Sequence, residues 1–399
     1  MLLPRRRMLA LLLAGPWLAR ETVPARAQDP IALLLDRLTG DPQSRLQAWK
    51  DARARFDAEL TAYWEQVSTR RTERRRKIRA GQAATADDYV SVFPPEYTGP
   101  KLTPELQALL AEEEKKEPPK PPPEPLPVVA DFLAHAKTVY GFEPERIPEP
   151  EFKRRYARES LAHGLTKEQV VRVYIFETGG NGTADMQAGI NPQTRQGRAI
   201  SSALGYAQLL NANSVNEIVK HGEAFIQRLS RMAAAPGTPP ARVTSLRAKQ
   251  QVLRKMLTRA RSVPNEWANH MRFANTPDGL GIHALNLDGD IGPWLQSAKL
   301  NDIRKYAIGE GRPVLTAAEL ELMNLAGPST GIEMMTPVGA AMPTPNFFSR
   351  GGYERNSIVR GRTAAELLLE IDRRMDAWQR QPGAVEFARI FDEVAREPR

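Results

Sequence analysis

One glutamate, Glu177, combines a side chain that can transfer protons with a position that would bury it. It closes the apolar run of residues 170–176 and is followed by a threonine and two glycines. On a helix it would share a face with Val173 and Tyr174, which precede it by four and three residues. We therefore expect its carboxyl group to lie beside apolar side chains at the carboxyl end of a helix.

Burial and the helix end would act on this carboxyl group in the same direction. Apolar surroundings disfavour its charged form, and the negative end of the helix dipole disfavours it as well. A carboxylic acid that stays neutral near pH 7 can protonate a glycosidic oxygen as the bond breaks. A glutamate that caps a helix or forms an ion pair would fit the same position, so the residue alone does not decide its function.

Two further segments follow Glu177 in the chain. Residues 201–210 read Ser-Ser-Ala-Leu-Gly-Tyr-Ala-Gln-Leu-Leu, and residues 323–328 read Met-Asn-Leu-Ala-Gly-Pro. Together with Glu177-Thr178 these segments resemble the lysozyme-like lytic transglycosylases, the family of the soluble lytic murein transglycosylase catalytic domain. That family has a helix ending in Glu-Ser, then Ser-x-x-Gly-Ala-x-Gly-Leu-Met-Gln, and later Ala-Tyr-Asn-Ala-Gly-Pro. The resemblance covers roughly residues 160–335.

The chain departs from the family pattern at several points. Thr178 stands at the usual serine, Met323 replaces the family's tyrosine, and Leu325 looks inserted. The loop of residues 179–200 is longer than its counterpart. The chain would therefore be a divergent member.

The resemblance implies a mainly α, goose-lysozyme-type domain whose groove binds peptidoglycan glycan strands. Glu177 would be the general acid and then the base, and Asn324 would lie near the reacting sugar. The groove near Glu177 would be lined by Gly205, Tyr206 and Gln208. The expected activity is cleavage of the bond between N-acetylmuramic acid and N-acetylglucosamine, with a 1,6-anhydro product and no cofactor.

Two alternatives remain open at this point. A hydrolytic muramidase would need a second carboxylate at about 5–9.5 Å, and Asp185 is the nearest in sequence, although a turn or cap aspartate fits that position too. A non-catalytic peptidoglycan-binding or envelope-assembly protein could use the same fold. The missing tyrosine and the amino-terminal region motivate that second alternative.

The amino terminus carries the features of an export signal. A basic cluster, Arg5 to Arg7, precedes the apolar residues 8–18, and Ala25-Arg26-Ala27 resembles a cleavage site. We expect residues 1–27 to be a signal peptide and the mature protein to be periplasmic, with an uncleaved membrane anchor as the alternative. The chain has no cysteine, which excludes disulfides and thiolate chemistry.

The net charge of +9 favours anionic partners such as the cell envelope. Export argues against nucleic acid as the partner, and the sequence leaves the oligomeric state open. The basic block Arg70–Arg79 could contact an anionic envelope surface, or it could be the solvated end of a helix whose dipole favours cations.

The expected organisation has four parts after the signal peptide. We expect a helical segment over 28–111 with one long helix at 43–79, and a proline-rich linker over 112–127. A catalytic domain over 128–345 and a carboxyl-terminal helical extension over 346–399, packed on it, would follow. Helical patterns also cover 166–178, 214–233, 241–261 and 363–379, whereas the glycine-rich residues 179–202 predict a loop or small hairpin.

The sequence gives little reason to expect a metal. Its five histidines show no pair at metal-ligand spacing. The alternation of Asn286, Asp288 and Asp290 resembles a calcium loop, but the turn glycine is displaced and Ser297 stands where a bidentate glutamate is needed. The aromatic segment 346–353 could flank a sugar groove or simply pack.

Overall fold

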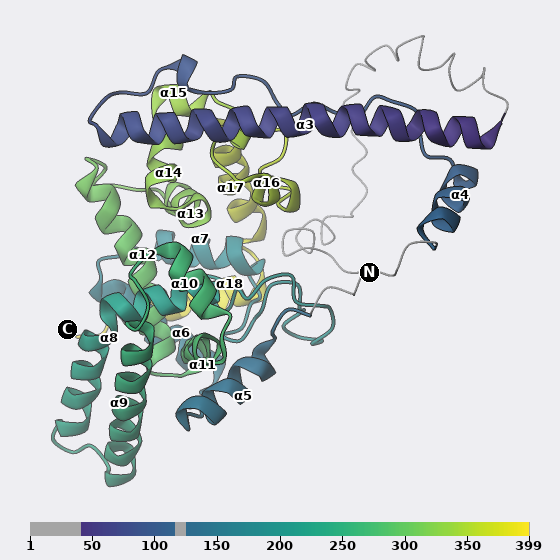
Figure 1. The fold of residues 1–399 in the computed structure, drawn as a ribbon. Helices are drawn as coiled ribbons and strands as arrows, with labels where there is room; N and C mark the ends of the chain where they lie inside the picture. Colours follow the sequence, from purple (N-terminus) through teal and green to yellow (C-terminus); the bar gives the residue numbers. More distant parts are fainter. Residues whose placement is uncertain (1–40, 116–124, 399) are drawn as a thin grey trace. The chain divides into compact units, whose positions relative to one another are not determined.

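The computed structural model describes residues 41–115 and 125–398, and its described part is helical, without a β-strand (Figure 1). This confirms the mainly α prediction. The predicted signal peptide and residues 116–124 of the predicted linker lie outside the described residues. Within the described part, no helix is both long enough and apolar enough to cross a membrane.

The described residues form two compact units, each built from separate stretches of the chain. Residues 125–335 and 365–398 form the first unit, and residues 41–115 and 336–364 form the second. This division differs from the predicted organisation, because residues 336–345 group with the amino-terminal segment. The predicted carboxyl-terminal extension is likewise divided between the two units at residue 365.

The second unit is organised along one long helix, α3 (Pro42–Arg79), which confirms the helix predicted over 43–79. Asp41 caps it by accepting hydrogen bonds from the backbone amides of Gln43 and Ser44. The unit also contains η1 (Ala86–Asp88), α4 (Pro104–Glu114), α15 (Pro337–Ala340), η3 (Thr344–Asn346) and α16 (Arg350–Arg355). Because α4 continues to Glu114, the predicted linker begins a few residues later than residue 112.

Part of the basic block on α3 has a structural function within this unit. The guanidinium group of Arg71 donates to the carbonyl oxygens of Pro345, Asn346 and Phe348. Arg74 is fully buried and donates to the carbonyl oxygens of Asp88 and Asn346. The segment 346–353 therefore packs against α3, whereas Arg76 and Arg79 remain exposed and available for the predicted anionic contact.

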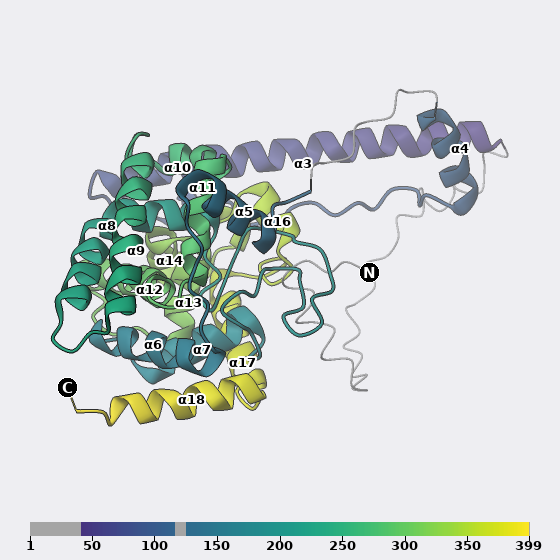
Figure 2. The same ribbon diagram turned by 90° about the horizontal axis from the view of Figure 1, so that it is seen from below.

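The first unit is a helical bundle. Its elements are α5 (Val129–Tyr140), α6 (Glu149–Ala162), α7 (Lys167–Thr178), α8 (Asn211–Ala234), α9 (Pro240–Ala260), α10 (Trp267–Ala274), α11 (Pro277–His283), η2 (Ala284–Leu287), α12 (Ile291–Gly309), α13 (Ala317–Ala326), α14 (Pro328–Met334), α17 (Ala364–Trp378) and α18 (Pro382–Ala395). Helices α8 and α9 form a hairpin, and α18 lies against α6 and α7 (Figure 2). Helices α8, α9 and α17 confirm the patterns read over 214–233, 241–261 and 363–379.

The short helix α7 forms where its sequence predicts it. Thr166 and Gln169 make the expected capping box, in which each side chain accepts from the other residue's backbone amide. Gly179 ends the helix in the left-handed conformation with φ 67°. These two signals place Glu177 in the last turn.

The segment between α7 and α8 is irregular, with isolated antiparallel bridges such as Ile190 with Gly197 and Leu204 with Leu209. The second bridge closes a tight turn in which Gly205 has φ 73° and Gln208 has φ 44°. A Cβ atom on Gly205 would lie 2.3 Å from the Nε2 atom of Gln296. Only glycine satisfies both the backbone conformation and this close approach.

Candidate functional site

Glu177 is buried at the end of α7, as predicted, with 6% of its surface exposed. Its Oε1 atom accepts a hydrogen bond of 3.0 Å from the Nδ2 atom of Asn324 on α13. The structure therefore joins two of the predicted site residues that are 147 positions apart in the sequence.

The two helices that carry this pair are fixed to each other near both ends. Near the start of α7, the side-chain amide of Gln169 donates to the carbonyl oxygen of Leu315, just before α13 begins. Near the end of α7, Glu177 accepts from Asn324. Helix α13 has its own capping box, formed by Thr316 and Glu319. The position of Asn324 next to Glu177 thus follows from two well-capped helices that run side by side.

A second carboxylate, Glu321, completes the arrangement. It is fully buried one turn before Asn324 on α13, and its Oε2 atom accepts from the same Nδ2 atom at 3.1 Å. The amide nitrogen has two hydrogens, so each carboxylate receives one of them. Since both carboxylate oxygens lie within 3.1 Å of one nitrogen, they cannot be farther apart than about twice that distance.

This arrangement fixes the orientation of the Asn324 amide. With both N–H groups directed at carboxylates, the carbonyl oxygen Oδ1 must point elsewhere. It is buried and has no hydrogen-bond partner among the described residues.

Asn324 also lines a cavity of about 770 Å³. The aromatic side chains of Trp267 and Tyr306 are exposed and border it. The polar and charged side chains of its lining, apart from Asn324, are Asn213, Asn216, Glu217, Lys220, Lys299, Asp302 and Lys305. The residue that contacts the buried glutamate is thus also part of a hollow that is large and polar enough for a small ligand.

Tyr206 lies in the core of the first unit rather than at an open surface. It is 1% exposed, its ring packs edge-on against Tyr174 at 4.9 Å, and its hydroxyl donates to Glu149. Its backbone amide donates to Gln296 at 2.9 Å. A side chain at this depth supports α7 from within, and its predicted contact with a glycan stays a prediction.

Gly205 and Gln208 shape the turn that holds Tyr206. The side-chain amide of Gln208 donates to the carbonyl oxygens of Met186 and Gly205, at 3.0 and 2.8 Å. Its Oε1 atom is buried without a hydrogen-bond partner among the described residues. Both hydrogen bonds hold the turn and the segment before it, so the structure supports a scaffolding function, and groove lining stays a prediction.

Asp185, the carboxylate closest to Glu177 in sequence, is committed to ion pairs. Arg146 and Arg195 each approach its Oδ2 atom to 2.5 Å, and Thr183 donates to its Oδ1 atom. Burial alone would raise the pKa of Asp185, but the bonds from Arg195, Thr183 and Arg146 outweigh it and lower the pKa to about 2. This supports the structural interpretation of Asp185.

Glu321 is the site residue that sequence reasoning missed. A signal was present, because Glu321 precedes Asn324 by three residues and would share its face on any helix. The Thr316–Glu319 capping box identifies that helix in the sequence. The spacing of Glu321 and Asn324 on this helix thus points to the second carboxylate from the sequence.

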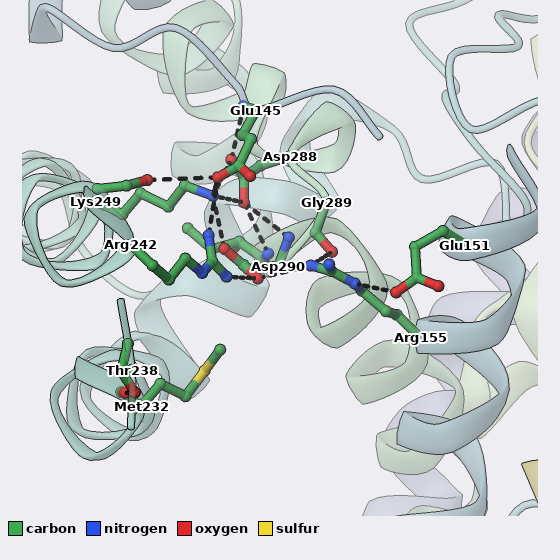
Figure 3. Close-up of polar contacts among 12 residues, drawn as sticks. Glu145, Glu151, Arg155, Met232, Thr238, Arg242, Lys249, Asp288, Gly289 and Asp290 are labelled. Carbon is green, nitrogen blue, oxygen red and sulfur yellow. Dashed lines mark hydrogen bonds and ion pairs between the residues drawn. The ribbon is translucent and has the colours of Figure 1, made fainter. Parts of the chain in front are cut away.

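A separate group of charged side chains joins α9 to the segment before α12 (Figure 3). The buried Lys249 contacts Glu145, Asp288 and Asp290 at 2.8, 3.0 and 2.6 Å. Burial disfavours the charged amine, yet the carboxylates outweigh this effect and raise the pKa of Lys249. Asp288 and Asp290, part of the calcium-like sequence, are thus bound to a lysine.

Comparison with protein-family models, curated proteins and solved structures gives no match.

Proposed function

We propose that this protein is a peptidoglycan lytic transglycosylase on a lysozyme-like helical fold, exported to the periplasm. The observation that carries the proposal is the hydrogen bond between the buried Glu177 and Asn324, which lines the cavity. These two residues come from two separate elements of the sequence pattern that resembles this family.

The surroundings of Glu177 suit an acid catalyst. The side chain is buried, so solvent does not compete for its proton. The amide of Asn324 holds one carboxyl oxygen, which fixes the orientation of the group that must reach the glycosidic oxygen. A fixed orientation of the carboxyl group is one of the requirements of general acid catalysis.

The cavity has the chemistry that an amino-sugar strand would need. Trp267 and Tyr306 offer aromatic faces for sugar rings, and the amide groups of Asn213 and Asn216 can bond to hydroxyl and acetamido groups. Lys305 lies at the same cavity and could attract a carboxylate of the peptide stem that muramic acid carries. The lining thus combines apolar faces with a small number of polar groups.

The reaction needs only one proton carrier. Glu177 gives its proton to the bridging oxygen as the bond between that oxygen and the anomeric carbon of muramic acid breaks. The resulting carboxylate takes the proton of the sixth-carbon hydroxyl, whose oxygen bonds to the anomeric carbon. The products are a 1,6-anhydro end and a strand with a free hydroxyl, and Glu177 is protonated again.

The test is digestion of purified sacculi, followed by mass spectrometry of the released fragments. We expect the wild-type protein to release anhydro-muropeptides and Glu177→Gln to lower the rate by about 100- to 10,000-fold. Asn324→Ala, which removes the group that orients Glu177, should cost about 100-fold. Glu168→Gln, an equal change at an exposed position of α7, is the matched control and should retain the wild-type rate.

Glu321 supports a second candidate function, hydrolysis. Its carboxylate and that of Glu177 lie within a range that includes the separation of about 5–5.5 Å found in retaining glycosidases. Reducing ends in place of anhydro ends, lost in both Glu177→Gln and Glu321→Gln, would establish the hydrolase instead. Binding to sacculi without any cleavage would refute both and favour a non-catalytic envelope protein.

A further inference from the structure

Three side chains that can ligate a metal meet beside the cavity described above. Glu217 and His221 come from α8, and Asp302 comes from α12. One potential ligand atom from each side chain lies within 4.8 Å of the other two. Glu217 and Asp302 line the cavity itself. Tertiary packing thus gathers a cluster that a search for histidine pairs in the sequence could not find.

The spacing of the donor atoms is close to that of a zinc site. The Nε2 atom of His221 lies 3.0 Å from Oδ2 of Asp302 and 3.4 Å from Oε2 of Glu217. Ligands that surround zinc tetrahedrally at about 2.0–2.2 Å are themselves roughly 3.3–3.6 Å apart. Little movement is therefore needed to place one ion between the three atoms.

One carboxylate oxygen of Glu217, Oε2, is directed into this cluster, with His221 as its neighbour. The side chain is 2% exposed, and its Oε2 atom accepts no hydrogen bond from the described residues. Its other oxygen, Oε1, accepts from Asn216 at 3.1 Å, which fixes the orientation of the carboxylate. A buried carboxylate oxygen that accepts no hydrogen bond costs free energy unless a cation is nearby. The Nε2 atom of His221 lies 3.4 Å from this oxygen, and a metal ion would take the place of the proton on that nitrogen.

The ammonium group of Lys220 would compete with a metal ion for these carboxylates. Its Nζ atom lies 3.1 Å from Oδ2 of Asp302 and 3.4 Å from Oε1 of Glu217. The side chain is 41% exposed, so its long flexible stem can turn the ammonium group into solvent. A divalent ion would then replace the positive charge that Lys220 now supplies.

We propose that Glu217, His221 and Asp302 form a site for a divalent transition metal ion of the zinc class. One imidazole and two carboxylates favour zinc, cobalt or nickel over magnesium and calcium, which prefer oxygen ligands alone. Three protein ligands leave a fourth position, which the cavity can fill with water or with an anionic group of a ligand. Metal binding at these residues is independent of the glycan-cleaving activity proposed above.

The test is titration of the full chain, first stripped with a chelator, with zinc chloride in a calorimeter. We expect one ion per chain and an increase in melting temperature. His221→Ala and Asp302→Asn should each weaken binding by more than the about 10- to 100-fold that loss of an outer partner of a ligand costs. His135→Ala on α5 is the matched histidine control, and magnesium chloride is the control ion.

Lys220→Gln separates a metal site from a purely internal ion-pair cluster. If Lys220 competes with the ion, this variant should bind zinc more tightly than the wild type. Circular dichroism of each variant verifies that it is folded. Absence of zinc binding by the wild type up to millimolar concentration, or binding that both His221→Ala and Asp302→Asn leave unchanged, would overturn the proposal.

Discussion

At the scale of single residues, Asn324 explains how the site is held together. Its one amide group donates to Glu177 and to Glu321, so two buried carboxylates share a neutral partner. Asp185, in contrast, is held by two arginines and a threonine. An amide can partner either protonation state of a carboxyl group, whereas an arginine favours the ionised form.

Asp185 gives a pH-dependent prediction. Because its folded pKa is lowered from 3.8 to about 2, its stabilising contribution is present above pH 3.8 and is lost as the pH falls through 2. Asp185→Asn should therefore lower the free energy of unfolding by about 1–2 kcal/mol near neutral pH, a range that allows for solvent screening of the exposed arginines.

Urea unfolding of the wild type and this variant at pH 7, 4 and 2.5 measures the effect. The difference between the two proteins should shrink at the lowest pH. A difference that stays constant from pH 7 to 2.5 would show that the ion pairs of Asp185 do not stabilise the fold.

At the scale of elements, the capped helices α7 and α13 decide where Glu177 lies. Gln169 belongs to the capping box of α7 and also donates to Leu315 just before α13. Gln169 therefore caps the start of α7 and also holds the start of α13 beside it. The tight turn at Gly205 and Gln208 holds Tyr206 in the core. Tyr206 packs on Tyr174 and so supports α7 from within.

Removal of the amino-terminal cap of α7 should destabilise this helix without altering the side chain of Glu177. Thr166→Ala deletes the hydroxyl that accepts from the backbone amide of Gln169, and we expect a loss of about 1 kcal/mol in the free energy of unfolding. Thr166→Ser keeps the hydroxyl and should retain most of the stability. Thermal or urea unfolding checks the order, and equal stabilities of the alanine and serine variants would contradict it.

At the scale of the whole molecule, the chain forms its second unit from segments far apart in sequence. The side chain of Asn346 is fully buried, accepts from the backbone amide of Val90 and donates to the carbonyl oxygen of Val90. Arg71 and Arg74 add bonds from α3 to the same returning segment. The short segment around Asn346 thus provides hydrogen-bond partners that the amino-terminal segment could not provide for its own polar groups.

Asn346→Ala should loosen this unit. It leaves the amide and the carbonyl group of Val90 without their partner, at a cost of about 1–3 kcal/mol for each buried group. Hydrogen exchange followed by mass spectrometry should show faster exchange around Val90. Asn356→Ala, a change at a less buried asparagine, is the control, and protection equal to that of the wild type in Asn346→Ala would contradict the prediction.

The sequence by itself determined the local features of this protein. Capping residues and apolar periods predicted α3, α7, α8, α9 and α17, because such signals act within one or two helical turns. Burial of Glu177 followed from its apolar neighbours on the same helix face. Its partner Asn324 was named only through a resemblance in sequence pattern.

Only the tertiary structure decided which distant residues meet. It showed Glu321 beside Glu177, placed Tyr206 in the core, and brought His221 to Glu217 and Asp302. It also showed that residues 336–364 belong to the same unit as the amino-terminal segment. Local sequence cannot specify such contacts, because they depend on how helices pack through long-range burial, which no spacing along one helix encodes.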